Sequence, residues 1–182
     1  ILRASGQRVH LVGDIGVPPL DLLPSIQPSD VVVFEMSSFQ LWDLQKSPQI
    51  AVVLMIEPDH LDVHRDMDEY VGAKANIARF QSERDTVIYH PTNALSQQIA
   101  ELGSGRRVRY ANADGGGVYV REAEFIGPNG VICSVDAVQL PGAHNQDNAC
   151  AAITAALVAG ADPAFVEAGL RAVPAAGGRQ LP

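Results

Sequence analysis

The chain has 182 residues, which suits one domain with a small appended subdomain, and its 47% hydrophobic content supplies a core and excludes a disordered chain. Its net charge of −8 excludes broad nucleic-acid binding, which needs a basic surface, although a metal ion or local amides could still accommodate an anionic small substrate. Two cysteines without paired spacing exclude a zinc site or disulfide framework, and the lack of a bilayer-length apolar run or signal-peptide layout predicts a soluble, cytoplasmic protein.

Four apolar runs bounded by turn residues predict strands that are covered on both faces, as in a parallel sheet. They occupy residues 8–12, 30–35, 50–56 and 86–90. The clearest helix is predicted at 67–81, with Asp66 as its N-cap. Its apolar face would consist of Tyr70, Ala73, Ile77 and Phe80. Further helices are predicted at 93–102, 144–158 and 162–170.

Residues 107–140 differ from the rest, because short apolar runs alternate there with Gly- and Asn-rich turns. This pattern is typical of small antiparallel hairpins. We therefore expect a three-layer α/β fold, with a mostly parallel sheet flanked by helices and a small antiparallel β subdomain. The predicted domain spans 1–172, with the antiparallel flap at 105–141, and residues 173–182 form a Pro/Gly-rich tail or linker.

The first segment with chemical potential follows the second predicted strand, at residues 35–40. Glu35 ends the strand, at the edge where open α/β sheets bind their ligands. Ser37, Ser38 and Gln40 follow on the turn, a set that could hold a metal ion and an anionic group. The alternative is an ordinary strand-ending glutamate followed by two serines that cap a helix.

The second segment, at residues 57–62, follows the third predicted strand. Its carboxylates and His60 should emerge at the same sheet edge as Glu35. Such a group is a candidate divalent-metal cluster, and its oxygen-rich ligands favour Mg²⁺ over zinc. Taken alone, His60 could equally be a loop residue without a role.

Lys74 lies on the helix predicted at 67–81, among small residues and near this acidic loop. A lysine on a helix is ordinarily a solvated charge. A lysine with a lowered pKa could instead react with CO₂ and become a carbamate, which is a carboxylate-like metal ligand. The pattern of residues does not choose between these alternatives.

Asn145 and Asn148 lie three residues apart, on one face of the start of the helix predicted at 144–158. Side-chain amides offer donors and acceptors together, which suits the edge of an adenine ring. The alternative is that Asn145 caps the helix and Asn148 lies in its first turn.

A Gly-flanked turn follows the first predicted strand, at residues 12–18. Glycine at positions 13 and 16 would let a ligand approach the backbone closely. Taken singly, this turn does not identify a ligand.

These five segments, in this order, resemble the central domain of MurD-type ligases, and the resemblance covers nearly the whole chain. The matching segments are residues 13–16, 35–41, 59–62, 70–74 and 144–148. Those at 59–62 and 144–148 are shared by Mur ligases and folylpolyglutamate synthases. Those at 13–16 and 37–40 are similar to the MurD type in particular.

The resemblance implies a P-loop NTPase-like Mur ligase central domain and an ATP-dependent acid–amino-acid ligase of peptidoglycan synthesis. Its substrates would be UDP-N-acetylmuramoyl-L-alanine and D-glutamate, and we expect a monomer without membrane insertion. Glu35 would bind the Mg²⁺ at the ATP phosphates. His60 and a carbamylated Lys74 would hold a second Mg²⁺ beside the acyl phosphate. Glu35, His60 and Lys74 are thus the catalytic and metal-binding candidates.

The remaining implied contacts concern the two organic ligands. Asn145 and Asn148 would contact the adenine of ATP. Ser37, Gln40 and the residue at position 14 would contact the UDP-muramoyl-alanine substrate. Position 14 is Asp14 here, where the family usually has asparagine, so an anion replaces a donor amide.

The sequence also departs from the family pattern. No Gly-x-x-Gly-Lys-Ser/Thr loop occurs in it, and Arg179 only loosely echoes an arginine motif of the family, so no role is transferred to that residue. We expect a part of a longer ligase, without its outer domains, that is inactive in isolation. The alternatives are another Mur ligase or a folylpolyglutamate synthase-like ligase, and a non-catalytic nucleotide-binding fragment.

Overall fold

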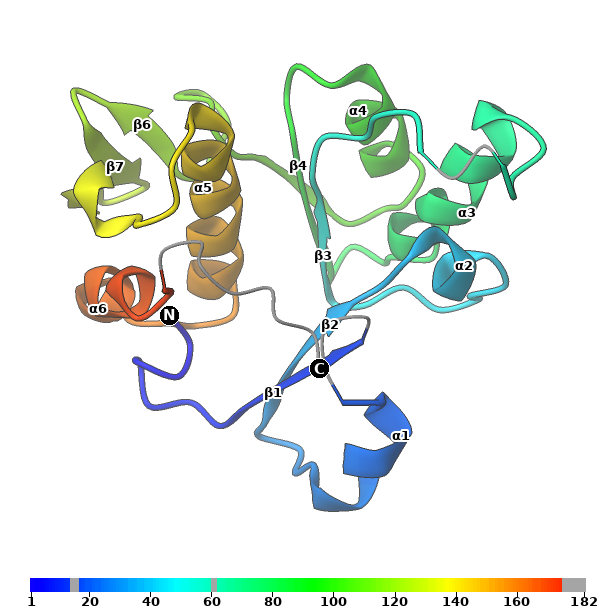
Figure 1. Ribbon diagram of the computed structural model, residues 1–182, viewed down its shortest axis with the longest axis horizontal. Coiled ribbons are helices and arrows are strands. Elements are labelled where there is room, and N and C mark those ends of the chain that lie inside the picture. Colours follow the sequence, from blue (N-terminus) through cyan, green and yellow to red (C-terminus); the bar gives the residue numbers. More distant parts are fainter. Residues whose placement is uncertain (14–16, 60–61, 175–182) are drawn as a thin grey trace. The chain divides into compact units, whose positions relative to one another are not determined.

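The computed structural model describes residues 1–13, 17–59 and 62–174. They form two compact units (Figure 1): Gln7–Arg107, called here the parallel-sheet unit, and residues 1–6 together with those from Val108 on, called the hairpin unit. Within the described residues, none of the helices combines the length and the apolar character that crossing a membrane requires.

The strands of the parallel-sheet unit confirm the predicted α/β class. β1 (Val9–Gly13) pairs in parallel with β2 (Val31–Glu35), and β3 (Ile50–Val53) pairs in parallel with β4 (Thr86–Tyr89). The other edge of β4 pairs with β5 (Arg106–Arg109). These strands form two sheets, β1-β2 and β3-β4-β5, where we expected one.

β3 ends three residues earlier than the apolar run predicts. The carbonyl of Leu54 accepts a hydrogen bond from Ser96 Oγ at 2.6 Å, and the carbonyl of Ile56 accepts one from Asn93 Nδ2 at 3.1 Å. These two side chains start the helix after β4 and take the carbonyls that a longer strand would offer to its neighbour. Side-chain competition for the backbone therefore ends the strand.

The helices of this unit are α1 (Pro19–Leu22), a short 3₁₀ turn (Leu23–Ser25), α2 (Ser38–Leu41), α3 (Met67–Arg79) and α4 (Ala94–Ala100). Asp66 caps α3 as predicted, because its carboxylate accepts the Glu69 N–H at 2.9 Å. Phe80 does not join the buried face: its backbone leaves the helical conformation, and its side chain is 46% exposed. α3 and α4 pack on β3 and β4 around a core of Ala51, Val53, Tyr70, Val71, Ala75, Ala78, Val87, Ile99 and Ala100.

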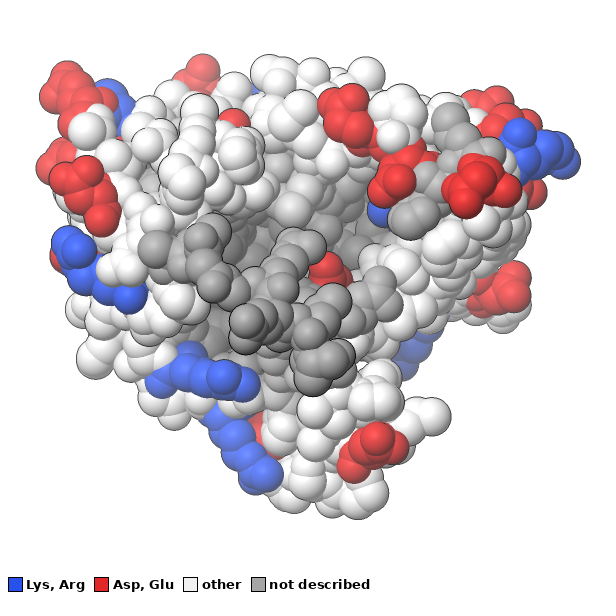
Figure 2. Space-filling view, viewed as in Figure 1, with Lys and Arg blue, Asp and Glu red and all other residues white. Residues whose placement is uncertain are grey.

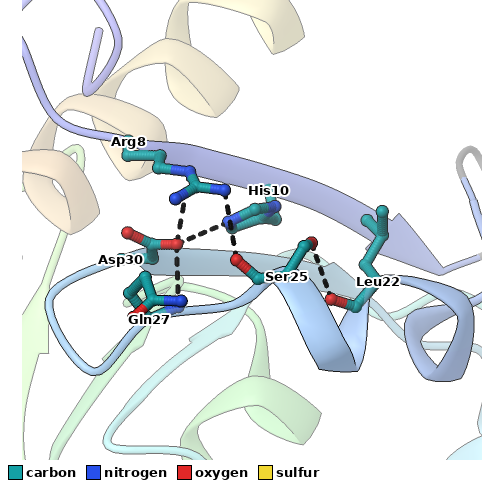
Figure 3. Close-up of polar contacts among 6 residues, drawn as sticks. All are labelled: Arg8, His10, Leu22, Ser25, Gln27 and Asp30. Atoms are coloured by element: carbon teal, nitrogen blue, oxygen red, sulfur yellow. Dashed lines mark hydrogen bonds and ion pairs between the residues drawn. The ribbon is translucent and has the colours of Figure 1, made fainter.

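A polar cluster ties β1 to the turn before β2 (Figure 3). The Asp30 side chain, only 3% exposed, accepts hydrogen bonds from the Gln27 N–H at 3.0 Å and from His10 Nε2 at 2.8 Å. Arg8 Nε lies 3.5 Å from the same carboxylate oxygen, and its NH2 group donates to the Ser25 carbonyl at 3.1 Å. The cluster therefore fixes the entry into β2 and, with it, the strand that carries Glu35.

We expect the Asp30 contribution to stability to depend on pH. The Gln27 N–H first, and then His10, hold the pKa of Asp30 below its ordinary value of 3.8. The charged carboxylate is thus favoured in the folded state, so its contribution is present above about pH 4 and is lost as the pH falls through the lowered pKa. In the full-length protein that contains this chain, Asp30→Asn should lower the melting temperature by several degrees at neutral pH.

The effect of the same substitution should shrink as the pH falls through the lowered pKa, because the wild-type carboxyl then becomes protonated as well. Melting curves recorded from about pH 2 to pH 7 test this. Asp21→Asn, on the exposed surface of α1, removes the same charge and serves as the control. A loss of stability in Asp30→Asn that is equal at every pH would contradict the prediction.

The described part of the hairpin unit contains three antiparallel strands, β6 (Tyr119–Arg121), β7 (Glu124–Gly127) and β8 (Gly130–Ser134). Glu122 and Ala123 connect β6 to β7 with φ of 53° and 63°, as a tight two-residue hairpin requires. The helices are α5 (Ala143–Val158) and α6 (Val166–Arg171), with 3₁₀ turns at Val135–Ala137 and Pro163–Phe165.

The predicted flap at 105–141 is too long at both ends. Its first run forms β5, which pairs with β4 and has Val108 only 4% exposed. At the other end, the Ser134 hydroxyl accepts the Asp136 N–H at 3.1 Å and starts a 3₁₀ turn, so the antiparallel sheet ends at Ser134. Both differences follow from contacts that the local pattern of apolar residues does not contain.

Candidate functional site

Glu35 lies at the carboxyl end of β2, where its side chain is exposed. The parallel register of β1 and β2 continues to the last pair, Gly13 opposite Glu35. Gly13 has φ of +108°, and a Cβ at this position would collide with the Glu35 carbonyl oxygen. Glycine is therefore required for β1 to approach the end of β2 so closely. The carboxylate is presented at the edge where open α/β sheets bind ligands.

Ser37 and Gln40 form a capping box at the start of α2. The Ser37 N–H donates to Gln40 Oε1 at 2.9 Å, and the Gln40 N–H donates to Ser37 Oγ at 3.4 Å. The helix-capping alternative is thus confirmed for Ser37. Capping does not exclude substrate binding, because the box uses the side-chain oxygen of Gln40 and leaves its NH2 group out of the cap.

Lys74 is half-buried on α3, with its Nζ 4.9 Å from the centre of the Tyr70 ring. Burial lowers the pKa of Lys74 from its ordinary 10.5, and the Asp59 carboxylate acts in the opposite direction. Burial, and after it the Asp59 charge, also raises the pKa of Tyr70. Lys74 therefore differs from a fully solvated lysine: its neutral amine, the form that reacts with CO₂, costs less to reach.

The start of α3 is acidic. Asp62, Asp66 and Asp68 are exposed there, and Arg65 pairs with Asp66 at 3.2 Å. Figure 2 shows acidic side chains gathered over this region at the upper right. Together with Asp59, they give the surroundings of Lys74 a net negative charge, which attracts cations.

Two of the predicted site residues, His60 and Asp14, lie outside the described residues, as does Arg179. Among the residues that the structure describes, no group of three or more His, Cys, Asp or Glu side chains could hold a metal ion. The metal cluster of Glu35, His60 and Lys74 stays a prediction, since one of its members is among the undescribed residues.

Asn145 and Asn148 belong to the hairpin unit and lie in the first two turns of α5. The helix begins at Ala143 with Gly142 as its N-cap, so the expectation that Asn145 caps it is wrong. The Asn145 side chain donates to the Pro141 carbonyl at 2.7 Å, whereas Asn148 is exposed. The adenine-contact role of both residues stays a prediction.

His64 is the residue that the sequence pattern missed. It is 1% exposed, and its Nε2 lies 2.9 Å from Ser38 Oγ, next to the capping box. A signal was present in the sequence, because four aromatic rings, those of Phe39, Trp42, His64 and Tyr70, occur near the polar segments at residues 35–40 and 57–62. Their mutual packing, however, depends on contacts between segments far apart in the chain.

Known proteins resemble this chain in both sequence and fold. The family model described as "Mur ligase middle domain" matches residues 13–156. The UDP-N-acetylmuramoylalanine–D-glutamate ligase of Symbiobacterium thermophilum is 41% identical over 169 residues, which cover 88% of this chain and 37% of that protein. The chain thus spans little more than a third of the length of this relative.

Two solved structures share the fold. The UDP-N-acetylmuramate:L-alanyl-gamma-D-glutamyl-meso-diaminopimelate ligase from Neisseria meningitides matches 95% of this chain and 60% of its own with a TM-score of 0.70 at 20% identity. The Mycobacterium tuberculosis folylpolyglutamate synthase complexed with ADP matches 85% of this chain and 37% of its own with a TM-score of 0.54 at 20% identity. At such low identity these likenesses establish the fold alone.

Proposed function

The chain belongs to the Mur ligase middle-domain family, and from that premise we propose that it is the central, ATP-binding domain of a ligase that joins D-glutamate to UDP-N-acetylmuramoyl-L-alanine. The observation that carries this proposal is the 41% identity, across 88% of the chain, to a relative named for that reaction. The segment from Glu35 to Gln40, placed at the carboxyl end of a parallel strand, supports it.

The proposed reaction has two steps. ATP transfers its γ-phosphoryl group to the substrate carboxylate, which gives ADP and an acyl phosphate. The amine of glutamate then attacks the acyl carbon and loses a proton, and phosphate leaves as the amide forms. Protein groups contribute mainly by positioning the reactants and by opposing negative charge.

The donor set fits magnesium. Glu35 offers an exposed carboxylate, and the half-buried Lys74 amine can attack CO₂ and lose a proton to become a carbamate, a second oxygen donor. In this proposal Glu35 would hold one Mg²⁺, and His60 with carbamylated Lys74 would hold the other. The two ions would offset negative charge on the phosphoryl oxygens.

The other candidate residues would bind and orient the organic reactants. Ser37 and Gln40, held by their capping box, would contact the UDP-muramoyl-alanine substrate together with Asp14. Asn145 and Asn148, one helical turn apart on α5, would contact the adenine of ATP. A charged Asp14 near an anionic substrate would favour recognition through a cation or through a donor on the substrate.

The proposal is tested on the full-length protein that contains this chain. With ATP and Mg²⁺, UDP-N-acetylmuramoyl-L-alanine and D-glutamate, we expect amide formation coupled to phosphate release, and no reaction when any component is omitted. Parallel assays should replace the muramoyl substrate by longer muramoyl peptides or by a folate. Turnover of one of those substrates, with none of the proposed one, would assign the chain to another member of the ligase superfamily.

A further inference from the structure

His64 lies at the junction of three segments of the parallel-sheet unit. Its Nε2 is 2.9 Å from Ser38 Oγ at the start of α2, and both residues are 1% exposed. Its ring stacks on Trp42 with centroids 4.5 Å apart, and on Phe39 with centroids 5.3 Å apart. The imidazole is thus enclosed by both ends of α2, and its hydrogen bond to Ser38 is shielded from water.

His64 also contacts α3. Tyr70 packs edge-on against His64, with centroids 5.3 Å apart and an interplanar angle of 63°. The same Tyr70 ring carries the Lys74 ammonium group at 4.9 Å from its centre. A continuous set of contacts therefore leads from Ser38 through His64 and Tyr70 to Lys74.

α2 is also held at its carboxyl end. Asn76, two residues beyond Lys74 on α3, donates to the carbonyls of Leu41 and Trp42, each at 3.0 Å. A helix of four residues has too few internal hydrogen bonds to hold its own position. Tertiary contacts therefore hold it in place, and they include the hydrogen bonds of His64 at one end and of Asn76 at the other.

His64 is placed to act through its neighbours and not on a ligand. Among the described residues, its second ring nitrogen, Nδ1, is buried without a hydrogen-bond partner, so Ser38 is the polar group that orients the ring. Removing either member of the pair leaves the other polar atom buried and unpaired, which favours a shift of α2.

We propose that His64 is a positioning residue: through Ser38 and Tyr70, it fixes the Ser37–Gln40 cap against α3, so that the substrate-contacting side chains keep a set position relative to Lys74. This inference rests on the proposed function. In this inference, His64 maintains the geometry of the muramoyl-substrate site. It takes no part in nucleotide binding or in the chemical steps.

The test compares His64→Phe, Ser38→Ala and the double variant in the full-length protein. Phenylalanine keeps the stacked ring and removes the hydrogen bond. We expect each single variant to raise KM for UDP-N-acetylmuramoyl-L-alanine about tenfold, as loss of one buried hydrogen bond would, and to leave KM for ATP unchanged. The double variant should be no worse than either single variant, because both remove the same interaction. His64→Gln, which retains a polar group near Nε2, should recover part of the loss.

The matched control is His90→Phe, the same substitution at another buried histidine of this unit, where the ring bonds Thr92. It should lower the melting temperature and leave every KM unchanged. An unchanged KM in His64→Phe, additive effects in the double variant, or an equal rise in KM in His90→Phe would overturn the inference.

Crystal structures of the wild-type protein and of His64→Phe separate this inference from the proposed function. If the wild-type protein does not use the muramoyl substrate, the proposed function fails. The positional claim is then decided by the structures: a displaced Ser37–Gln40 segment supports it, and an unmoved segment overturns it.

Discussion

Lys74→Ala should lower the ligase activity of the full-length protein by about a thousandfold, the range reached when a group that stabilises transition-state charge is lost. Lys74 is half-buried, and that burial lowers its pKa, so the amine can lose its proton and react with CO₂. The alanine substitution removes the carbamate-bearing side chain and leaves a space about the size of the part removed. Short-chain carboxylic acids should enter this space and restore part of the activity, because a carboxylate resembles a carbamate in charge and shape.

Two further variants make the Lys74 test specific. Lys74→Arg keeps the positive charge but cannot form a carbamate, so it should be as inactive as the alanine variant and should not respond to added acids. Lys46→Ala removes the only other lysine in the chain, an exposed one, and should retain full activity. Steady-state rates with and without acetate or propionate provide the measurement. Unchanged activity in Lys74→Ala would rule out the carbamate role.

The sequence was sufficient where local chemistry decides the structure. Asp66 was predicted as the cap of α3 because an N-cap needs only a short acceptor before an apolar period, and the structure has that hydrogen bond. The four parallel strands were likewise predicted, since a continuous apolar run between turns fits few other elements. The position of Glu35 at a strand end followed directly.

The sequence was insufficient where contacts between segments far apart in the chain determine the structure. Arg106–Arg109 reads as a hairpin strand, yet it pairs with β4, and no local pattern specifies the partner of a strand. Ser38 and His64 are 26 residues apart, so nothing in either segment predicts their hydrogen bond. The capping role of Ser37 and its substrate role likewise could not be separated from the sequence, because one side chain can serve both.

Glu35→Gln should raise the Mg²⁺ concentration needed for half-maximal activity at least about tenfold and lower kcat about a hundredfold. Glutamine has nearly the shape of glutamate, so β2 and its register with β1 should persist up to the Gly13–Glu35 pair. What changes is the charge: a neutral amide oxygen binds a hard divalent cation more weakly than a carboxylate does. The substitution should therefore weaken metal binding more than it lowers the stability of the fold.

Metal titration of the full-length protein distinguishes this effect from a general defect. Mn²⁺ in place of Mg²⁺ can be followed by electron paramagnetic resonance in the presence of ATP, which reports metal binding without turnover. Glu83→Gln, in the exposed turn between α3 and β4, removes the same charge and should leave both the metal affinity and kcat unchanged. If Glu35→Gln binds Mn²⁺ as tightly as the wild-type protein does, Glu35 is not a metal ligand, and its place at the end of β2 then reflects only where the strand stops.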